Sequence, residues 1–441
     1  MFAKSSIKKV IFPENKLQFV HEHRVDKNKS FFAIYVKLGS ALENSKQKGL
    51  CHLVEHLMFK SSIDHTTLEL AKELEKYGAQ VNAYTSFDSI CFHFSVLNEH
   101  FVKCFNIFTE MFLRKNITAE EFELEKNVVL QEYYMDQDSP MVLCGDAHYK
   151  HYFGLDPVIG FEKTIKSFTL GDVNNFINTY FTPKNMTISA VTNHSHHFVK
   201  KLVKKAYVDC FKCLYDSDVS DLWARYISTK SLPKNTPNIL VDQAKTQHIA
   251  VQITVPTILP VEEIVYGPYF SVLFSAGLSS VLFREVREKK GLCYGVHLDV
   301  DTFDEPHLSD FFGTTLSIST STEPEKVPEL LQTVESVLNH LPTLLTHEDI
   351  ERTNNFFKSE YVSASRYGFY NAINFNVKGI KGLDYNIKKR KHMTLKQIIK
   401  AYNKYVLHNG AVTCFTTLRG PLKKKQLNKL PKYTNFVNKN K

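Results

Sequence analysis

Two histidines and a glutamate lie close together in the segment His52-Leu-Val-Glu55-His56. On a helix, positions i and i+4 share one face, so both imidazoles can reach the same ion. Neutral imidazoles bind Zn²⁺ and leave an open position for water, and Glu55 lies within reach of that water. A carboxylate there can accept a proton as the water attacks a carbonyl group. The H-x-x-E-H spacing therefore predicts zinc-assisted hydrolysis.

A third ligand is expected, because a catalytic zinc ion usually takes three from the protein. Glu125 and Glu132 share one face of a helix predicted to begin at Thr118, and we expect Phe122, Val128 and Val129 on that face too. A carboxylate on an apolar face is costly unless it is paired or bound to metal. One solution is Glu132 as ligand with Glu125 supporting a ligand histidine. Two carboxylates at the edge of a solvated helix are the alternative.

The short motif also has an alternative interpretation, a helix with two surface histidines paired to a glutamate. Features elsewhere in the chain are therefore needed to distinguish a zinc site from paired surface side chains. Its 441 residues are enough for roughly two to four domains. The composition, 43% hydrophobic and 23% charged, excludes a disordered chain, a collagen-like fibre and a small disulfide scaffold.

The charge, the cysteines and the hydrophobic segments limit which partners and which cellular location are consistent with the sequence. The net charge of +9 comes partly from a lysine-rich segment that begins at Lys423, and no stripe of arginines and aromatics indicates a nucleic-acid partner. The eight scattered cysteines indicate reduced thiols, and the lone Cys210-x-x-Cys213 pair cannot close a four-ligand zinc site. Neither a secretory signal nor a membrane span is evident, so we expect a cytoplasmic protein without membrane contact.

The chain repeats itself once, at a spacing of about 225 residues. Thr169–Tyr180 and Thr394–Tyr405 each predict a helix with threonine near its N-cap, followed by a strand-like run. Upstream of these, the sequences at Thr118 and Thr346 each predict the start of a long helix. Two similar halves are therefore more consistent with the sequence than two unrelated domains.

Strand-like runs complete both halves, at 31–38, 90–96, 249–255 and 311–320. Strands and helices in this order predict an α+β fold, in which each domain is a mainly antiparallel sheet with helices packed on one face. We expect a first domain at 1–215, a linker at 216–237 and a second homologous domain at 238–441.

Taken together, these features resemble the pitrilysin, insulysin and mitochondrial processing peptidase family of zinc peptidases, in its short two-domain type. The residues that carry the resemblance are His52, Glu55, His56, Glu125 and Glu132, the flanking pairs Gly39-Ser40, Gly49-Leu50 and Phe59-Lys60, and the segments Asp138-x-Pro140 and Pro157-x-x-Gly160. The resemblance implies one Zn²⁺ ion per chain, held by His52, His56 and Glu132. Glu125 would support the ligands, and Glu55 would be the general base that later protonates the leaving amine.

Two further segments resemble substrate-binding elements of the family. The run from Asn82 to Ser86 resembles the family's substrate-side strand, so Asn82 and Ala83 are expected to receive the substrate as an added strand. The segment Leu282–Tyr294 resembles a second signature, in which Arg287 would hold a peptide carbonyl and Tyr294 would donate to the oxyanion. An ordinary surface arginine is the alternative for Arg287.

The second half carries no matching metal set at the repeat spacing, so the two halves have specialised. The resemblance then implies a dimer, in which Arg287 and Tyr294 of one subunit serve the zinc site of the other. We predict a zinc-dependent metalloendopeptidase that hydrolyses peptides or unfolded segments. Two alternatives stay open: a non-catalytic structural subunit of the same fold, and a catalytic subunit that requires a metal-free homologous partner.

Other histidines are expected to be structural or exposed. His21 and His23 share a predicted strand face that we expect to be exposed. His148 and His151 have no acidic residue at ligand spacing, so we expect structural roles for them.

Overall fold

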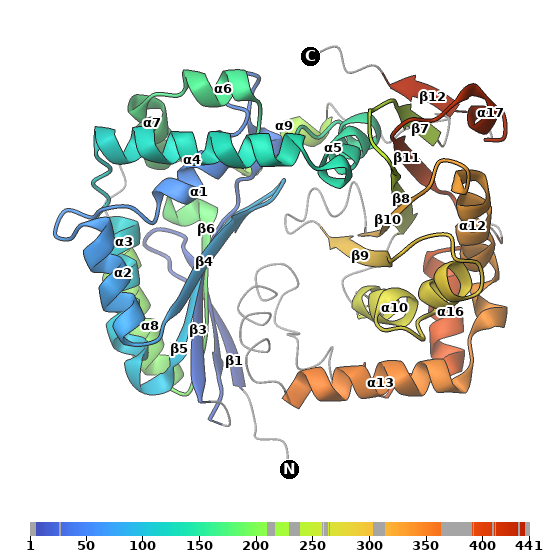
Figure 1. The fold of residues 1–441 in the computed structure, drawn as a ribbon. Helices are drawn as coiled ribbons and strands as arrows, with labels where there is room; N and C mark the ends of the chain where they lie inside the picture. The colour runs from blue at the N-terminus through green and yellow to red at the C-terminus, as the bar shows by residue number, and fades with distance from the viewer. Residues whose placement is uncertain are drawn as a thin grey trace.

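The structure is a computed structural model, and its described residues form two lobes, each built around one sheet (Figure 1). It describes residues 6–25, 28–209, 217–228, 239–257, 259, 263, 265–302, 314–362, 390, 392–407, 410, 412–430 and 433–436. The predicted pair Cys210 and Cys213 lies outside these residues, as does part of the predicted linker. Among the described helices, none combines the length and the hydrophobicity that a membrane span requires.

The sheet of the first lobe has the order β1-β2-β6-β3-β5-β4. Its strands are β1 Ser6–Ile11, β2 Gln18–His23, β6 Met186–Thr192, β3 Lys29–Val36, β5 Ile90–Leu97 and β4 Gln80–Thr85. Only β2 and β6 run parallel among these neighbours. The alternation along β3 sends Phe32 and Ile34 into the main core and Phe31 and Tyr35 to the opposite face. β4 ends the sheet, so it has one unpaired edge among the described strands.

Several helices of this lobe contribute side chains to its main core. They are α1 Leu50–Leu57, α2 Thr67–Lys76, α3 Phe101–Leu113, α4 Ala119–Gln137, α6 Glu162–Ser167, α7 Leu170–Tyr180 and α8 His196–Lys204. The predicted start of α4 is confirmed, because the Thr118 side chain accepts from the backbone of Glu121 and the Glu121 carboxylate accepts from the Thr118 backbone N–H. The reciprocal contacts of Thr169 likewise begin α7.

The second lobe repeats much of this arrangement, with the sheet order β12-β7-β11-β8-β10-β9. Its strands are β12 Tyr433–Phe436, β7 Ile239–Asp242, β11 Phe415–Arg419, β8 Ile249–Thr257, β10 Thr314–Thr322 and β9 Val296–Thr302, and its helices include α10 Tyr266–Ser275, α12 Val327–Leu344, α13 His347–Val362, α16 Leu395–Tyr405 and α17 Lys424–Leu427. The pair β7–β11 is parallel, like β2–β6, and β8, β10 and β9 follow antiparallel. The predicted α+β class is confirmed.

One helix joins the two lobes. α5, Pro140–Phe153, extends from the first lobe to the strands of the second (Figure 1). Its His148 lies between two hydroxyl groups, with Nδ1 3.0 Å from Thr417 Oγ1 and Nε2 2.8 Å from Thr254 Oγ1. Burial lowers the pKa of His148 to about 3. The neutral ring is therefore structural, as predicted, and it fastens α5 to the second sheet.

Part of the segment predicted to be a linker forms a helix. α9, Ser220–Ser228, lies inside the predicted linker, and its Trp223 is fully buried in the core of the first lobe. The indole Nε1 donates to the Lys37 carbonyl at 2.9 Å. The predicted domain boundaries stay a proposal.

One exposure prediction was wrong. His21 is only 1% exposed, because α8 packs over β2 and brings the ring of His196 against it, with the two Nδ1 atoms 2.8 Å apart. The two-residue alternation identified the strand face correctly. It could not show that a helix covers that face.

Candidate metal centre

The helix that carries the two histidines is fixed at its beginning. Gly49 precedes α1 with φ of 95°, and a Cβ there would approach the Ile159 carbonyl oxygen to 2.4 Å, so glycine is required. The Glu43 carboxylate accepts from the backbone N–H groups of Gly49 and Cys51, at 2.9 and 2.6 Å. These contacts satisfy N–H groups that have no partner inside the helix. Leu53 and Leu57 are buried in the core, which turns the histidines toward the cavity.

The structure brings the three predicted ligands together. One ligand atom each of His52, His56 and Glu132 lies within 4.8 Å of the other two. Glu132 Oε2 is 3.8 Å from His52 Nε2 and 3.5 Å from His56 Nε2. No other group of three or more His, Cys, Asp or Glu side chains converges in this way within the described ranges.

The chemistry of this donor set fits zinc. Two imidazole nitrogens and one carboxylate oxygen are a known set for catalytic zinc, which keeps its fourth position open. Burial, and then the neighbouring His56, lower the pKa of His52 to about 4, so His52 is neutral and able to coordinate near pH 7. Burial opposes charge on His56, yet hydrogen bonds with Glu125 and Glu132 outweigh it and raise its pKa to about 9. A metal ion must therefore displace a proton from His56.

Glu125 lies next to His56, on the side of the ring away from Glu132. Its Oε1 accepts from His56 Nδ1 at 2.9 Å, and its Oε2 pairs with the Lys60 ammonium. Burial alone would raise the pKa of Glu125, but the contacts with His56 and Lys60 outweigh it and lower that pKa. Helix periodicity predicted the position of Glu125, whereas the Lys60 contact was missed.

The apolar face expected beside these glutamates is only partly present. Phe122 and Val129 are buried in the core, but Val128 is 50% exposed. Val128 lies about one hundred degrees around the helix from Val129, so the two side chains differ in exposure.

Glu55 lies beside the ligands and is only 9% exposed. Thr85, at the end of β4, donates from Oγ1 to Glu55 Oε2 at 2.7 Å. Burial raises the pKa of Glu55, and the Thr85 hydrogen bond partly opposes that shift. The sequence places Thr85 in the run from Asn82 to Ser86 but assigns it no role. Its contact with Glu55 becomes visible only when α1 and β4 are packed together.

A cavity of about 520 Å³ opens in front of the ligands. Its lining comprises His52, Glu55, His56, Glu132, Asp136, Ala83, Tyr84, Thr85 and Phe87, the α5 residues Met141, Val142, Gly145, Asp146 and Tyr149, and the segment Pro157, Val158 and Ile159. Ala83 thus lines the cavity, whereas Asn82 is not among the lining residues and instead accepts from the Ala83 backbone N–H at 2.9 Å. Burial, and then Asp136, raise the pKa of Asp146 to about 7. No motif in the sequence indicated that Asp136 and Asp146 would line this cavity.

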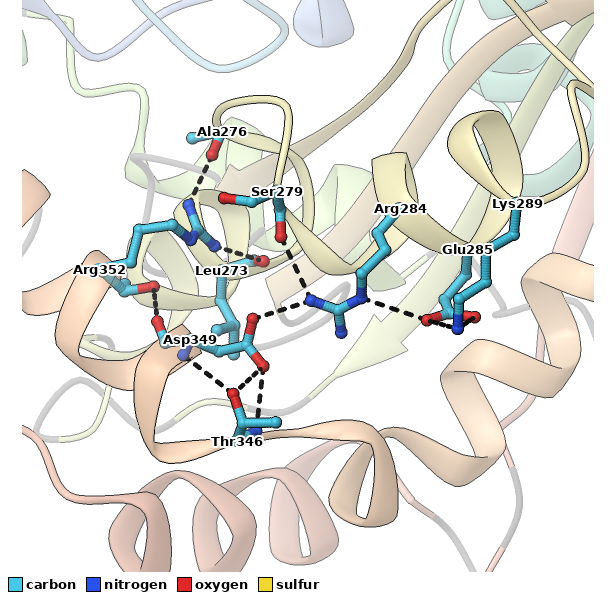
Figure 2. A network of polar contacts seen from close by, with 10 residues as sticks. Leu273, Ala276, Ser279, Arg284, Glu285, Lys289, Thr346, Asp349 and Arg352 are labelled. Carbon is cyan, nitrogen blue, oxygen red and sulfur yellow. Dashed lines mark hydrogen bonds and ion pairs between the residues drawn. The ribbon is translucent and has the colours of Figure 1, made fainter.

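Arg287 and Tyr294 lie in the second lobe and meet each other there. The guanidinium carbon of Arg287 is 5.1 Å from the centre of the Tyr294 ring, and Tyr294 is 87% exposed. Neither residue lines the cavity of the same chain. Arg287 lies in a π-helical turn, Phe283–Glu288. This turn contacts α13 through Arg284, which donates to the Asp349 carboxylate at 3.1 Å (Figure 2).

Two family models match successive parts of the chain. Residues 18–155 match the family described as Insulinase (Peptidase family M16), and residues 167–356 match the Peptidase M16 inactive domain. A Rickettsia felis protein named an uncharacterized zinc protease is 27% identical over 336 residues, covering 75% of this chain and 77% of that protein. A Bacillus subtilis protein, also named an uncharacterized zinc protease, is 24% identical over 326 residues, covering 73% and 77%.

Solved structures share the fold. A protease from Helicobacter pylori superposes with a TM-score of 0.75 at 21% identity, covering 95% of this chain and 100% of that one. A Pseudomonas fluorescens structure described as a peptidase M16 inactive domain gives a TM-score of 0.77 at 15% identity, covering 95% and 98%.

Proposed function

The chain belongs to the insulinase family of peptidases, family M16, and we propose that it is a zinc-dependent metalloendopeptidase acting on peptides or unfolded segments. The observation that carries this proposal is the convergence of His52, His56 and Glu132 on one point, with Glu55 lining the same cavity. The relatives that are named zinc proteases support it.

A non-catalytic structural subunit is the second candidate. It is favoured by the match of residues 167–356 to an inactive domain and by the likeness to the Pseudomonas fluorescens structure, which is described in the same words. That family match concerns a region that carries no second metal set within its described residues, however, and the ligands of this chain lie in the other matched region, 18–155. We therefore favour the peptidase.

In the proposed mechanism, His52, His56 and Glu132 would hold one Zn²⁺ ion per chain, which would supply Lewis acidity and an activated water. Glu55 accepts the proton of the attacking water and later donates it to the leaving amine. The raised pKa of Glu55 suits this exchange, because it makes the carboxylate a stronger base toward the attacking water, while its protonated form is still acidic enough to protonate the leaving amine. Thr85 holds one oxygen of Glu55, leaving the other for the reaction.

The substrate would bind along β4 as an added strand. β4 ends its sheet and Ala83 lines the cavity, so backbone hydrogen bonds could hold an extended peptide beside Glu55. Asn82 would support this strand through its contact with the Ala83 N–H. Such binding depends little on substrate side chains, and we expect no nucleic acid or membrane among the partners.

The Arg287–Tyr294 pair would act across a dimer, holding the substrate backbone and stabilising the oxyanion at the partner subunit's site. This proposal is supported by the exposure of Tyr294 and by the absence of both residues from the described lining of their own chain's cavity. A homodimer is favoured because one chain carries both half-sites, and a heterodimer with a homologous subunit is the alternative. Mixed dimers of Glu55→Gln and Tyr294→Phe subunits should regain up to one working site; inactive, verified mixed dimers would contradict the sharing.

The peptidase proposal is tested with a quenched peptide library and three preparations: wild type, wild type treated with a chelator, and Glu55→Gln. We expect cleavage only by untreated wild type, with equal zinc in Glu55→Gln and wild type. Wild type that contains zinc but cleaves nothing would indicate a missing partner. Wild type that binds no zinc would favour the structural subunit.

A further inference from the structure

A short polar chain extends from a ligand histidine to a lysine outside the ligand set. The Glu125 carboxylate uses Oε1 for His56 Nδ1, at 2.9 Å, and Oε2 for the Lys60 ammonium. Lys60 and the Glu125 carboxylate between it and His56 are both largely covered, since their side chains are 22% and 11% exposed. One carboxylate therefore joins a proposed metal ligand directly to a cation.

The backbone of Lys60 is itself held in place. α1 ends at Leu57, and the Lys60 N–H donates to the Leu57 carbonyl at 3.1 Å. The Lys60 carbonyl in turn accepts from Lys115 Nζ at 2.8 Å. Because both backbone groups are bonded, the ammonium is presented to Glu125 from a fixed point rather than from a loose loop.

This arrangement determines which nitrogen of His56 is free to bind a metal ion. When Nδ1–H donates to Glu125, the free lone pair of the neutral imidazole lies on Nε2, the atom that points toward Glu132. A carboxylate bonded through one oxygen can rotate about its terminal torsion, which is soft. With Lys60 on the second oxygen, that rotation is restricted, and the ring of His56 is oriented with it.

The charge of the Glu125 carboxylate is a second reason to assign a role to Lys60. A covered carboxylate without a compensating partner is costly. Imidazole binds metal in its neutral form, so His56 contributes no formal charge once it is a ligand. Of the two described side chains that pair with the Glu125 carboxylate, Lys60 is then the one that remains a cation.

We propose that Lys60 is a positioning residue of the metal centre, which fixes the Glu125 carboxylate so that His56 presents Nε2 to the ion. This inference rests on the proposed zinc site. It assigns to Lys60 a role in metal affinity that does not require Lys60 to touch metal or substrate.

The test compares zinc dissociation constants of Lys60→Met, Lys60→Arg and wild type, measured by chelator competition. We expect Lys60→Met to bind zinc about 10- to 100-fold more weakly, the usual effect of removing a partner behind a ligand. Lys60→Arg keeps the charge and should recover most of the affinity. The melting temperature of the zinc-free proteins is measured in parallel, because a merely structural role would lower it without weakening zinc selectively.

Lys126→Met is the matched control. Lys126 is also a covered lysine, 13% exposed, and it pairs with Glu123 on α4 at 2.9 Å without contacting a ligand. Its replacement should leave zinc affinity unchanged. If Lys60→Met fails to fold, Lys60→Gln takes its place with the same expected loss, because Gln keeps polarity but not charge.

The outcomes separate the two proposals. Wild-type zinc affinity in Lys60→Met, or an equal loss in Lys126→Met, overturns the role of Lys60 while leaving the zinc site intact. Wild type that binds no zinc overturns the proposed function itself.

Discussion

Replacing Thr85 by valine should slow peptide hydrolysis without removing the metal. Valine keeps the branched shape of threonine on β4 but loses the hydroxyl that donates to Glu55 Oε2 at 2.7 Å. A hydrogen bond to a charged group contributes about 1.5–3 kcal/mol, and each 1.4 kcal/mol changes a rate about tenfold. If this bond orients and stabilises the basic form of Glu55, kcat should fall by roughly tenfold to a hundredfold near neutral pH.

The assay measures kcat and KM on one quenched peptide over a range of pH, with zinc content determined for each preparation. Loss of the hydroxyl removes an interaction that lowers the pKa of Glu55, so the acid limb of the profile should move to higher pH. Thr85→Ser keeps a donor and is the control, with activity near wild type. Unchanged kcat at every pH in zinc-loaded Thr85→Val would refute the reasoning.

Two further predictions concern metal binding and stability. Because the pKa of His56 is raised to about 9 while that of His52 is lowered to about 4, zinc must displace a single imidazole proton between these values. Zinc affinity should therefore rise about tenfold per pH unit from about pH 6 toward 9, with one proton released in calorimetry; a flat profile would contradict the His56–Glu125 pairing. Trp223→Ala should lower the free energy of unfolding of the first lobe by about 3–5 kcal/mol, measured by urea denaturation, because Trp223 is fully buried; a loss below about 1 kcal/mol would show that α9 is not part of that core.

The sequence predicted the parts of the site that depend on local structure. The i, i+4 spacing of His52 and His56 and the seven-residue spacing of Glu125 and Glu132 follow from helix geometry alone. The threonine caps at Thr118 and Thr169 are equally local, and the structure contains both.

The contacts that the sequence could not reveal join elements that are distant along the chain. Thr85 reaches Glu55 only because β4 pairs at the end of its sheet, and Lys60 reaches Glu125 only because α1 packs against α4. The docking of α5 on the second sheet brings Asp146 into the cavity while the same helix buries His148 between the lobes. Periodicity identifies a face of an element but not its partner, which is also why His21 was expected at the surface.

The central claim, that His52, His56 and Glu132 hold one zinc ion within reach of Glu55, is tested most directly by anomalous diffraction at the zinc edge. Crystals of zinc-loaded protein should show one strong anomalous peak per chain between the two Nε2 atoms and the Glu132 carboxylate. A fully loaded protein whose zinc peak lies elsewhere, or that shows no peak at this position, would contradict the claim.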